Sequence, residues 1–495
     1  MQKKIIKPNI HKVSISLNEI RKLTKKYNFV EISIELENIT SNPISIYENI
    51  ANKEDPGFIL DFINPGEKTP YVSYLSHEIM EIIDVNDEDP TQKLRNYFDN
   101  ISIYLSDETR DFSFGAVGYF GYETFKYFEP SVGLLKKDPN NCPEASFMIP
   151  QSMISFFHNE QKVIVSTILK LDGKDLEKNY FKATDKLNSL SFLILNNTTF
   201  KEEEKIFQNQ KTTDFKPNIM RNDYISMVKQ AKDHILKGEL IQCVLSQRFL
   251  LEKKFQDINE EFKFNDLKFI KLYSYLVEKN PSDYMYYFNF GNNFQIIGSS
   301  PEMFLKVRGN KVIIRPVAGT TSIDKNKDFS EKLFHLKNSE KDNAEHIMLV
   351  DLARNDLGRV CKTGSVKVSK LMNIETYSHV AHIVSEIEGI IRPEFDCFDA
   401  FIASFPTGTL VGAPKIRAAQ LISELEPEGR GPYCGAIGWF DIRGNIDTGT
   451  IIRSVIIKDE KISYNGGGGI VFDSDPELEY QETLDKTKIF NEYIE

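Results

Sequence analysis

Two acidic patterns in the chain have the spacing of metal ligands. Glu479 and Glu482 are three residues apart and follow Asp475-Pro476, which can cap and open a helix, so both carboxylates would share one helix face. Asp342 and Glu345 repeat this spacing. Two such faces opposite each other would suit Mg²⁺, a hard cation that prefers oxygen ligands and keeps several waters. The competing interpretation is a solvated acidic face, which the spacing alone favours.

A run of glycines precedes the later acidic pair. Residues 465–470, with Gly467 and Gly469 among them, could bring backbone N–H groups close to an anionic ligand. Neither Gly-Lys-Ser/Thr nor Gly-x-Gly-x-x-Gly accompanies the run, so a nucleotide phosphate loop is not indicated, and a tight turn is the alternative. The nearby loop 405–415 contains two prolines, and its Thr409 could bind a substrate or help to cap the next helix.

Three further side chains could move protons. Glu302 follows an apolar stretch at 295–300, where burial would raise the pKa of its carboxyl and suit it to general-acid catalysis; the alternative is a solvent-facing carboxyl. His379 and His382 are three residues apart, but no Glu or Cys stands at metalloprotease spacing, so zinc is disfavoured. Proton transfer by one histidine and a structural role remain open.

The elements that must position these residues fall into two regions. Residues 15–200 show several stretches of period-two alternation, typical of strands, with short helical stretches between them. A polar, charged segment around 197–218 indicates a boundary, and helices and strands alternate after it. We therefore expect an N-terminal region at 15–200, which could carry a regulatory site, and a catalytic region at 219–490.

Composition narrows the class of protein. The chain has 495 residues and a formal net charge of −11, which argues against a nucleic-acid binder. Hydrophobic residues make up 41%, which excludes wholesale disorder. The five scattered cysteines form no CxxC pair and fit a reducing compartment. Because no apolar run reaches the ~18–20 residues of a membrane helix and no signal peptide is recognisable, we expect a cytoplasmic globular protein without a membrane partner.

Taken together and in this order, these segments resemble the chorismate-utilising enzymes, and most closely the component I family of anthranilate synthases. The resemblance covers nearly the whole chain. It implies an α/β (α+β) fold in which a large two-sheet β-sandwich with flanking helices holds the active site in a cleft between two lobes. Its most specific stretches are GSSPE, RPVAGTT, AEHIMLVDLARNDLGRV, YSHVAHIVS, FPTGTLVGAPK, IIRSV, NGGGGIVFDSDPE and EYQETLDK.

The resemblance also implies roles for individual residues. Mg²⁺ would be held by Glu345 and Glu482, with Glu479 and Asp342 behind them; Asp342 is shorter than the Glu usual at its position. Glu302 would protonate the departing C4 hydroxyl of chorismate, and His382 would assist the later loss of pyruvate. The positions that match substrate-binding residues are Thr409, Tyr433, Arg453, Gly467, Gly469 and Lys486.

Two positions sort the family by reaction. Relatives that add water to make isochorismate have a lysine where this chain has Gln242, and relatives that make 4-amino-4-deoxychorismate have a lysine nucleophile where it has Ala318. Both positions favour amination of chorismate by ammonia at C2, followed by pyruvate elimination to anthranilate, the first step of tryptophan biosynthesis. Since no Gly-x-Cys-x-Gly elbow is present, a separate glutamine amidotransferase subunit, component II, would supply the ammonia.

The chain departs from the family pattern at the tryptophan-inhibition site. The family has a Leu-Leu-Glu-Ser run and an Asn-Pro-Ser-Pro-Tyr-Met run; here Asp61 and Phe62 end the first, and Asp283 interrupts the second. Val411 also replaces a serine beside the active site. We expect weak feedback inhibition by tryptophan. The matching residues are Asp61, Phe62, Pro281, Tyr284 and Met285.

Three alternatives stay open. One is a 2-amino-2-deoxyisochorismate synthase, which stops before pyruvate loss. Another is component I of a 4-amino-4-deoxychorismate synthase, which Ala318 disfavours. The third is a catalytically idle subunit that only docks an amidotransferase, which the set Glu302, Glu345, His382, Arg453 and Glu482 argues against.

Overall fold

The computed structural model describes residues 9–52, 55–171, 175–197, 215–251, 268–322, 329–376, 380–459 and 461–490. His379 and most of the polar segment 197–218 lie outside these residues. The longer helices are α1 (Leu17–Leu23), α2 (Pro43–Ile50), α3 (Pro90–Asp99), α5 (Leu176–Asn196), α6 (Arg221–Leu236), α7 (Lys268–Lys279), α8 (Phe329–Asn338), α9 (Glu340–Gly358), α10 (Cys397–Ser404), α11 (Lys415–Leu425) and α12 (Pro476–Asp485).

The strands form two groups along the chain. The first is β1 (Asn9–Ile10), β2 (Phe29–Glu37), β3 (Gly57–Ile63), β4 (Pro70–Val85), β5 (Ile103–Tyr104), β6 (Gly115–Phe120), β7 (Ala145–Phe157) and β8 (Lys162–Lys170). The second is β9 (Lys216–Pro217), β10 (Gln242–Leu251), β11 (Tyr284–Asn289), β12 (Phe294–Ser300), β13 (Met303–Arg308), β14 (Lys311–Ile314), β15 (Val317–Ser322), β16 (Lys367–Thr376), β17 (Val380–Ile390), β18 (Gly412–Ala413), β19 (Ala436–Asp441), β20 (Ile446–Thr450), β21 (Ser454–Lys458) and β22 (Lys461–Ile470).

Strands from both groups interleave in one hydrogen-bonded network. From β10 the ladders run through β22, β21, β12 and β11 to β3 and β4, and then through β7, β6, β19, β20, β13 and β14 to β17. Every ladder among the described strands is antiparallel except β2–β5. The division into 15–200 and 219–490 stays a prediction. Strands of the two predicted regions are hydrogen-bonded to each other, β3 with β11 and β6 with β19.

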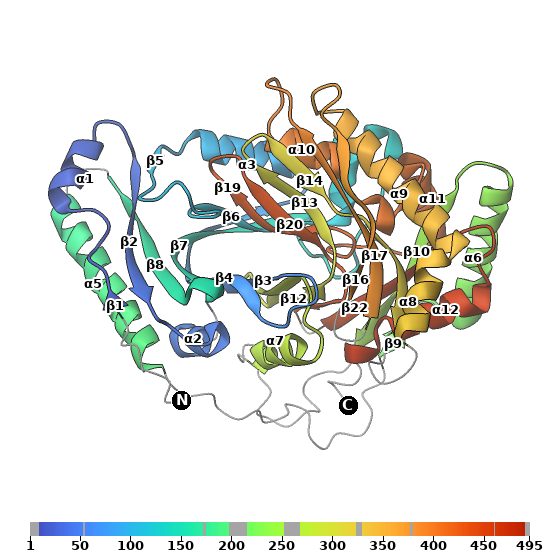
Figure 1. The fold of residues 1–495 in the computed structure, drawn as a ribbon, viewed down its shortest axis with the longest axis horizontal. Coiled ribbons are helices and arrows are strands. Elements are labelled where there is room, and N and C mark those ends of the chain that lie inside the picture. Colours follow the sequence, from blue (N-terminus) through green and yellow to red (C-terminus); the bar gives the residue numbers. More distant parts are fainter. Residues whose placement is uncertain are drawn as a thin grey trace, which may run out of the picture.

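A largely aromatic core fills the space between two layers of this network (Figure 1). One layer contributes Phe58, Phe288 and Ile296 from β3, β11 and β12, and the other contributes Val117 and Trp439 from β6 and β19. These side chains are almost fully buried. The two-layer arrangement of sheets with flanking helices therefore confirms the expected α/β (α+β) fold.

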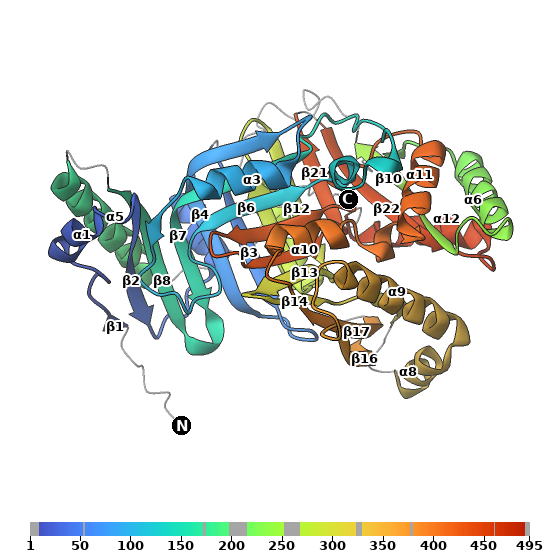
Figure 2. The same cartoon turned by 90° about the horizontal axis from the view of Figure 1, so that it is seen from above.

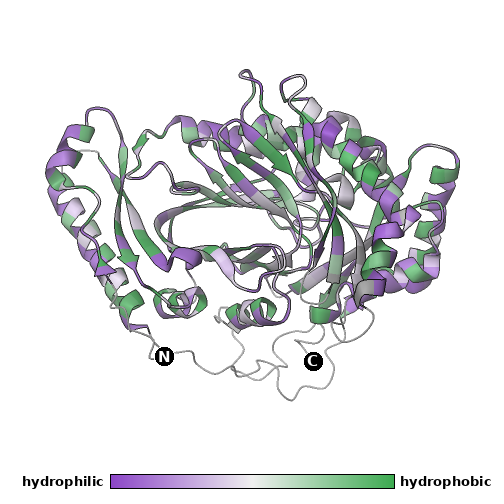
Figure 3. Cartoon of the chain, viewed as in Figure 1, coloured by the Kyte–Doolittle hydropathy of each residue, from purple (hydrophilic) through white to green (hydrophobic). Residues whose placement is uncertain are grey.

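Helices cover the two ends of the molecule. Figure 2 shows α1 and α5 at one end, and α6, α11 and α12 at the other. In Figure 3 the helices carry purple, hydrophilic segments while the central strands are mostly green. No described helix combines the length and the apolar character needed to cross a membrane.

The two helices that carry the predicted metal ligands, α12 and α9, each begin directly after a capping residue. Asp475 Oδ1 accepts hydrogen bonds from the N–H groups of Glu477 (2.9 Å) and Leu478 (3.1 Å), and Pro476 opens α12. Ser339 Oγ accepts from the N–H of Asp342 (3.2 Å) at the start of α9. Each cap fixes the first turn, so the acidic pairs are presented from ordered helix starts.

Candidate active site

The glycine run is the end of strand β22, so the alternative of a tight turn is wrong. It pairs with β10, where Ser246 lies opposite Gly467 and Val244 opposite Gly469. A Cβ atom on Gly467 would lie 2.9 Å from the hydroxyl oxygen of Tyr433, and one on Gly469 would lie 2.4 Å from Gln242 Nε2. A side chain at either position would collide with these groups, so the glycines let Tyr433 and Gln242 lie directly against the backbone of the strand.

Helix α12 approaches the same strand from its other face. A Cβ on Gly468 would lie 2.9 Å from Glu479 Oε2 and 3.7 Å from Glu482 Oε1. Glu479 is buried, whereas Glu482 is 47% exposed and pairs with Lys486 at 2.6 Å. Lys486 Nζ also donates to the carbonyl of Gly467 (2.9 Å). One lysine therefore joins the acidic helix to the glycine backbone.

Helix α9 brings its acidic pair to the opposite face. Glu345 Oε1 accepts a hydrogen bond from Gln242 Nε2 (2.7 Å) and lies 3.6 Å from the Cβ position of Gly469. Gln242 is buried, and its Oε1 has no hydrogen-bond partner among the described residues. Asp342 packs near Gly319, whose Cβ position is 3.4 Å from its own Cβ.

The donor set is compatible with a hydrated Mg²⁺. All four predicted ligands offer carboxylate oxygens, the donor type that Mg²⁺ prefers. Glu479 and Glu482 lie on the Gly468 side of β22 and Glu345 on the Gly469 side. No three of these four described carboxylates bring oxygens within 4.8 Å of one another, so an Mg²⁺ ion bound here would complete its coordination with water. The four residues are Asp342, Glu345, Glu479 and Glu482.

Glu302 is a buried carboxyl just beyond β12. It is 4% exposed, and its Oε1 accepts a hydrogen bond from Thr409 Oγ1 (2.5 Å). Burial raises the pKa of Glu302 to about 7, while the Thr409 hydrogen bond and the positive charge of Lys486 act to lower it. The alternative of a solvent-facing carboxyl is wrong. A carboxyl with a pKa near neutrality can carry a proton at physiological pH, as a general acid must.

His382 is buried on β17. Its strand pairs with β15, where Ala318 lies opposite Ile383. Burial and the positive charges of Arg453 and Lys486 together lower the pKa of His382 to about 4, against a backbone hydrogen bond involving Gly319 that raises it. The imidazole is therefore neutral at physiological pH and able to accept a proton.

The buried ion pair Arg430–Glu426, which the sequence did not reveal, connects the elements around the site. Arg430 is 2% exposed; its Nε and one terminal nitrogen donate to Glu426 (3.0 and 2.7 Å). It also donates to the carbonyls of Val244 on β10 (2.7 Å) and Leu410 beside Thr409 (2.9 Å). The only sequence signal is an i,i+4 Glu–Arg spacing, which usually marks an exposed helix surface.

The residues matched to tryptophan inhibition lie on two faces of one ladder. β3 pairs with β11 so that Asp61 is opposite Met285 and Phe62 is opposite Tyr284. Phe62 packs edge-to-face on Tyr284, with ring centroids 5.3 Å apart. Asp61 accepts from the Tyr273 hydroxyl (2.5 Å), and burial raises its pKa to about 6. Because neighbouring strand residues face opposite sides, Asp61 and Phe62 do not share a pocket wall.

Comparison with known proteins assigns a family to this architecture. The family model described as chorismate binding enzyme matches residues 57–492. Anthranilate synthase component 1 of Aquifex aeolicus is 35% identical over 505 residues, covering 98% of each chain. The crystal structure of anthranilate synthase component I from Streptococcus pneumoniae is 32% identical with a TM-score of 0.69, covering 91% of this chain and 97% of that one.

A more distant structure shares the fold alone. The menaquinone-specific isochorismate synthase of Escherichia coli has a TM-score of 0.71 at 17% identity, covering 97% and 99% of the two chains. The chain described here belongs to the chorismate binding enzymes, a family of chorismate-utilising enzymes. Its curated relatives at about 35% identity carry the name anthranilate synthase component 1.

Proposed function

We propose that the chain is component I of an anthranilate synthase and converts chorismate and ammonia into anthranilate and pyruvate. The observation that carries the proposal is the buried Glu302 held by Thr409 in a site that has Gln242 and Ala318, rather than lysines, at its two sorting positions. With no lysine base or nucleophile there, ammonia can add to the ring directly. The names of the relatives support the same reaction.

The chain offers several groups to the two carboxylates of chorismate. Arg453 supplies a positive charge and Tyr433 a hydroxyl, and the backbone of Gly467 and Gly469 would lie along a substrate carboxylate. Lys486, already bonded to the carbonyl of Gly467, adds a second cation. Mg²⁺, held by Glu345 and Glu482, would supply counter-charge to one carboxylate. A protein of net charge −11 can thus bind a dianion through local groups.

Glu302 and His382 would each carry out one proton transfer of the reaction. Glu302, protonated near neutral pH, gives its proton to the C4 hydroxyl, which leaves as water while ammonia adds at C2. His382, neutral at the same pH, accepts a proton from C2 as the enolpyruvyl group departs and the ring becomes aromatic. The pKa of Glu302, about 7, suits a proton donor near neutral pH, whereas the low pKa of His382 keeps its ring neutral and so free to accept a proton.

The ammonia would come from a glutamine amidotransferase subunit in the cytoplasm, because the sequence has no nucleophile elbow of its own. Tryptophan would inhibit weakly. Both follow from the family resemblance and from the departures at residues 58–62.

The direct test is incubation of the purified chain with chorismate, Mg²⁺ and ammonium at pH ~8, where free ammonia is available. A fluorescent aromatic amine identified as anthranilate supports the proposal. Accumulation of a non-aromatic amine would instead identify a 2-amino-2-deoxyisochorismate or 4-amino-4-deoxychorismate synthase, and no consumption of chorismate would identify a docking subunit.

A further inference from the structure

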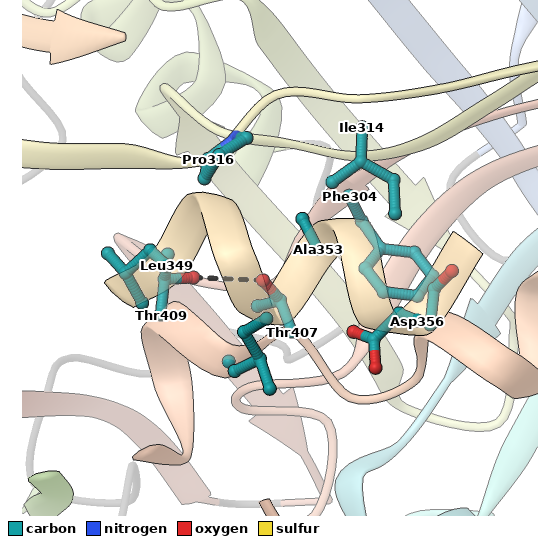
Figure 4. Close-up of a pocket in the computed structure, with 11 residues that line it drawn as sticks. Phe304, Ile314, Pro316, Leu349, Ala353, Asp356, Thr407 and Thr409 are labelled. Carbon is teal, nitrogen blue, oxygen red and sulfur yellow. Dashed lines mark hydrogen bonds between the residues drawn. The ribbon is translucent and has the colours of Figure 1, made fainter. Parts of the chain in front are cut away.

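A small cavity lies beside Thr409, the residue bonded to Glu302 (Figure 4). Its volume is about 20 Å³, and a single water molecule needs roughly 10–15 Å³ measured in this way. Phe304, Leu349 and Ala353 form apolar walls, and Thr407 and Asp356 contribute polar groups. The cavity therefore has the size and the polar partners for one ordered water.

A chain of hydroxyls leads from this cavity to the proposed general acid. Thr407 Oγ1 and Thr409 Oγ1 are 3.0 Å apart, and Thr409 Oγ1 donates to Glu302 Oε1 at 2.5 Å. Each hydroxyl has one hydrogen to give and lone pairs to accept another, so the two threonines can pass a proton along the chain. The carboxyl they reach is buried, so little of it is in contact with bulk solvent.

An ion pair stands at the other end of the cavity. Lys415 Nζ donates to Asp356 Oδ2 (2.8 Å) and to the carbonyl of Ser404 (2.9 Å). Burial raises the pKa of Asp356, so this carboxyl takes up a proton more readily than an exposed one. The side chains of Lys415 and Asp356 are 10% and 8% exposed.

The proposed reaction consumes one proton at Glu302 in every turnover. The C2–N bond forms as the C4–O bond breaks and the ring double bonds shift, and the C4 oxygen leaves as water with the proton of Glu302. The ammonium formed at C2 releases one proton to solvent, so the net count balances only when another proton returns to Glu302.

We propose that the cavity holds a water molecule which, with Thr407 and Thr409, relays protons from the Lys415–Asp356 pair to Glu302 after each turnover. The proton passes from the Asp356 carboxyl through the water and both hydroxyls to the Glu302 carboxylate, and solvent returns a proton to Asp356. The relay rests on the proposed function, because only that reaction uses Glu302 as an acid.

The test compares one turnover with many in the full chain. With enzyme in excess over chorismate, both proteins start with the same fraction of Glu302 protonated, so Thr407→Val should react within about twofold of the unaltered chain. With chorismate in excess, its steady-state rate should fall about tenfold or more and show a larger solvent isotope effect. Thr407→Ser keeps the hydroxyl and should preserve both rates.

A second variant tests the water separately from the hydroxyl. Ala353→Val adds bulk to the cavity wall and leaves Thr407 intact, so it should show the same split between single and multiple turnovers. Unchanged steady-state rates in both variants would show that Glu302 is recharged from the substrate side, and equal losses in both regimes would make Thr407 a substrate-positioning residue. Either result overturns the relay alone, whereas an unaltered chain that never forms anthranilate contradicts the proposed function.

Discussion

Two regions of the molecule contain the same pair of unusual groups, a buried carboxyl and a histidine of low pKa. In the candidate active site these are Glu302, with a pKa of about 7, and His382, with a pKa of about 4. Under the β3–β11 ladder they are Asp61, with a pKa of about 6, and His158, with a pKa of about 4. Each carboxyl accepts a hydroxyl hydrogen bond at 2.5 Å. Perturbed pKa values alone do not separate the two regions.

The two regions differ in the charged groups that surround the buried carboxyl. Arg453 and Lys486 act on the first region, which borders a strand of glycines and a water-sized cavity. Around Asp61 the hydrogen-bonding groups are the hydroxyls of Tyr273 and Ser73, and among the described residues no cation contributes to its pKa. Burial perturbs both carboxyls, but of the two regions as described the first is the one where positive charges act on the buried groups.

The sharpest way to test this contrast is to remove the metal. EDTA should abolish turnover, and Glu482→Gln should do the same, because a substrate carboxylate would lose its counter-charge. Glu477→Gln is the matched control, since Glu477 lies on the same helix but is exposed and paired with Arg221. Calorimetric titration of chorismate into the Glu482→Gln variant, with and without Mg²⁺, would show whether the variant has lost metal-dependent binding of chorismate. Full activity in EDTA would contradict the proposed requirement for Mg²⁺ in the candidate active site.

The next largest effect concerns the carboxyls themselves. Glu302→Gln removes the proton but keeps the shape, so kcat should fall by ~10²–10⁴. The activity of the unaltered chain should decline above pH ~7 as Glu302 loses its proton. Asp61→Asn should change kcat by less than about twofold. A loss below tenfold in Glu302→Gln would mean that the proton comes from another group.

The two histidines give a third contrast. His382→Met should still aminate chorismate but release little anthranilate, so the aminated, non-aromatic intermediate should accumulate in chromatography. His158→Met, in the other region, should leave the ratio of products unchanged. Equal loss of both half-reactions in His382→Met would instead make His382 a binding or structural residue.

A tryptophan titration addresses what the second region does. If the family's serine binds tryptophan, Phe62 at its position would remove one hydrogen bond to a charged ligand, which would weaken binding by ~1.5–3 kcal/mol, about 10- to 150-fold in affinity. We therefore expect weak inhibition of the ammonia-dependent rate and stronger inhibition after Phe62→Ser. Since Phe62 packs on Tyr284, a melting curve must show that the variant is folded. Tight inhibition of the unaltered chain without gain in the variant would place the regulatory site elsewhere.

The smallest effect on catalysis belongs to Asp61, where stability should respond instead. Its pKa of about 6 in the folded chain exceeds the ordinary 3.8, so folding favours the protonated form. The resulting stability is fully present below pH ~4 and is lost as pH rises through ~6, a change of about 3 kcal/mol. Asp61→Asn should remove this pH dependence from the free energy of unfolding measured in urea. Parallel pH profiles for the two proteins would contradict it.

The sequence predicts the local features of the site better than its assembly. Asp475 predicts the start of α12, and the apolar stretch before Glu302 predicts that Glu302 is buried. Both features are predictable because helix capping and hydrophobic patterning are local properties of the sequence. The pairing of β3 with β11 depends on partners far apart in the chain, which local periodicity cannot specify. The Arg430–Glu426 pair has the spacing of a surface pair, and only the fold buries it.

The interleaving of early and late strands constrains how the chain is made. Phe120 at the end of β6 pairs with Ala436 on β19, so one edge of β6 has no native partner until nearly the whole polypeptide has left the ribosome. At typical synthesis rates this delay is of the order of tens of seconds. During it, the strand edge of β6 is open to wrong pairing, so we expect fragments divided near residue 210 to yield native structure only when produced together.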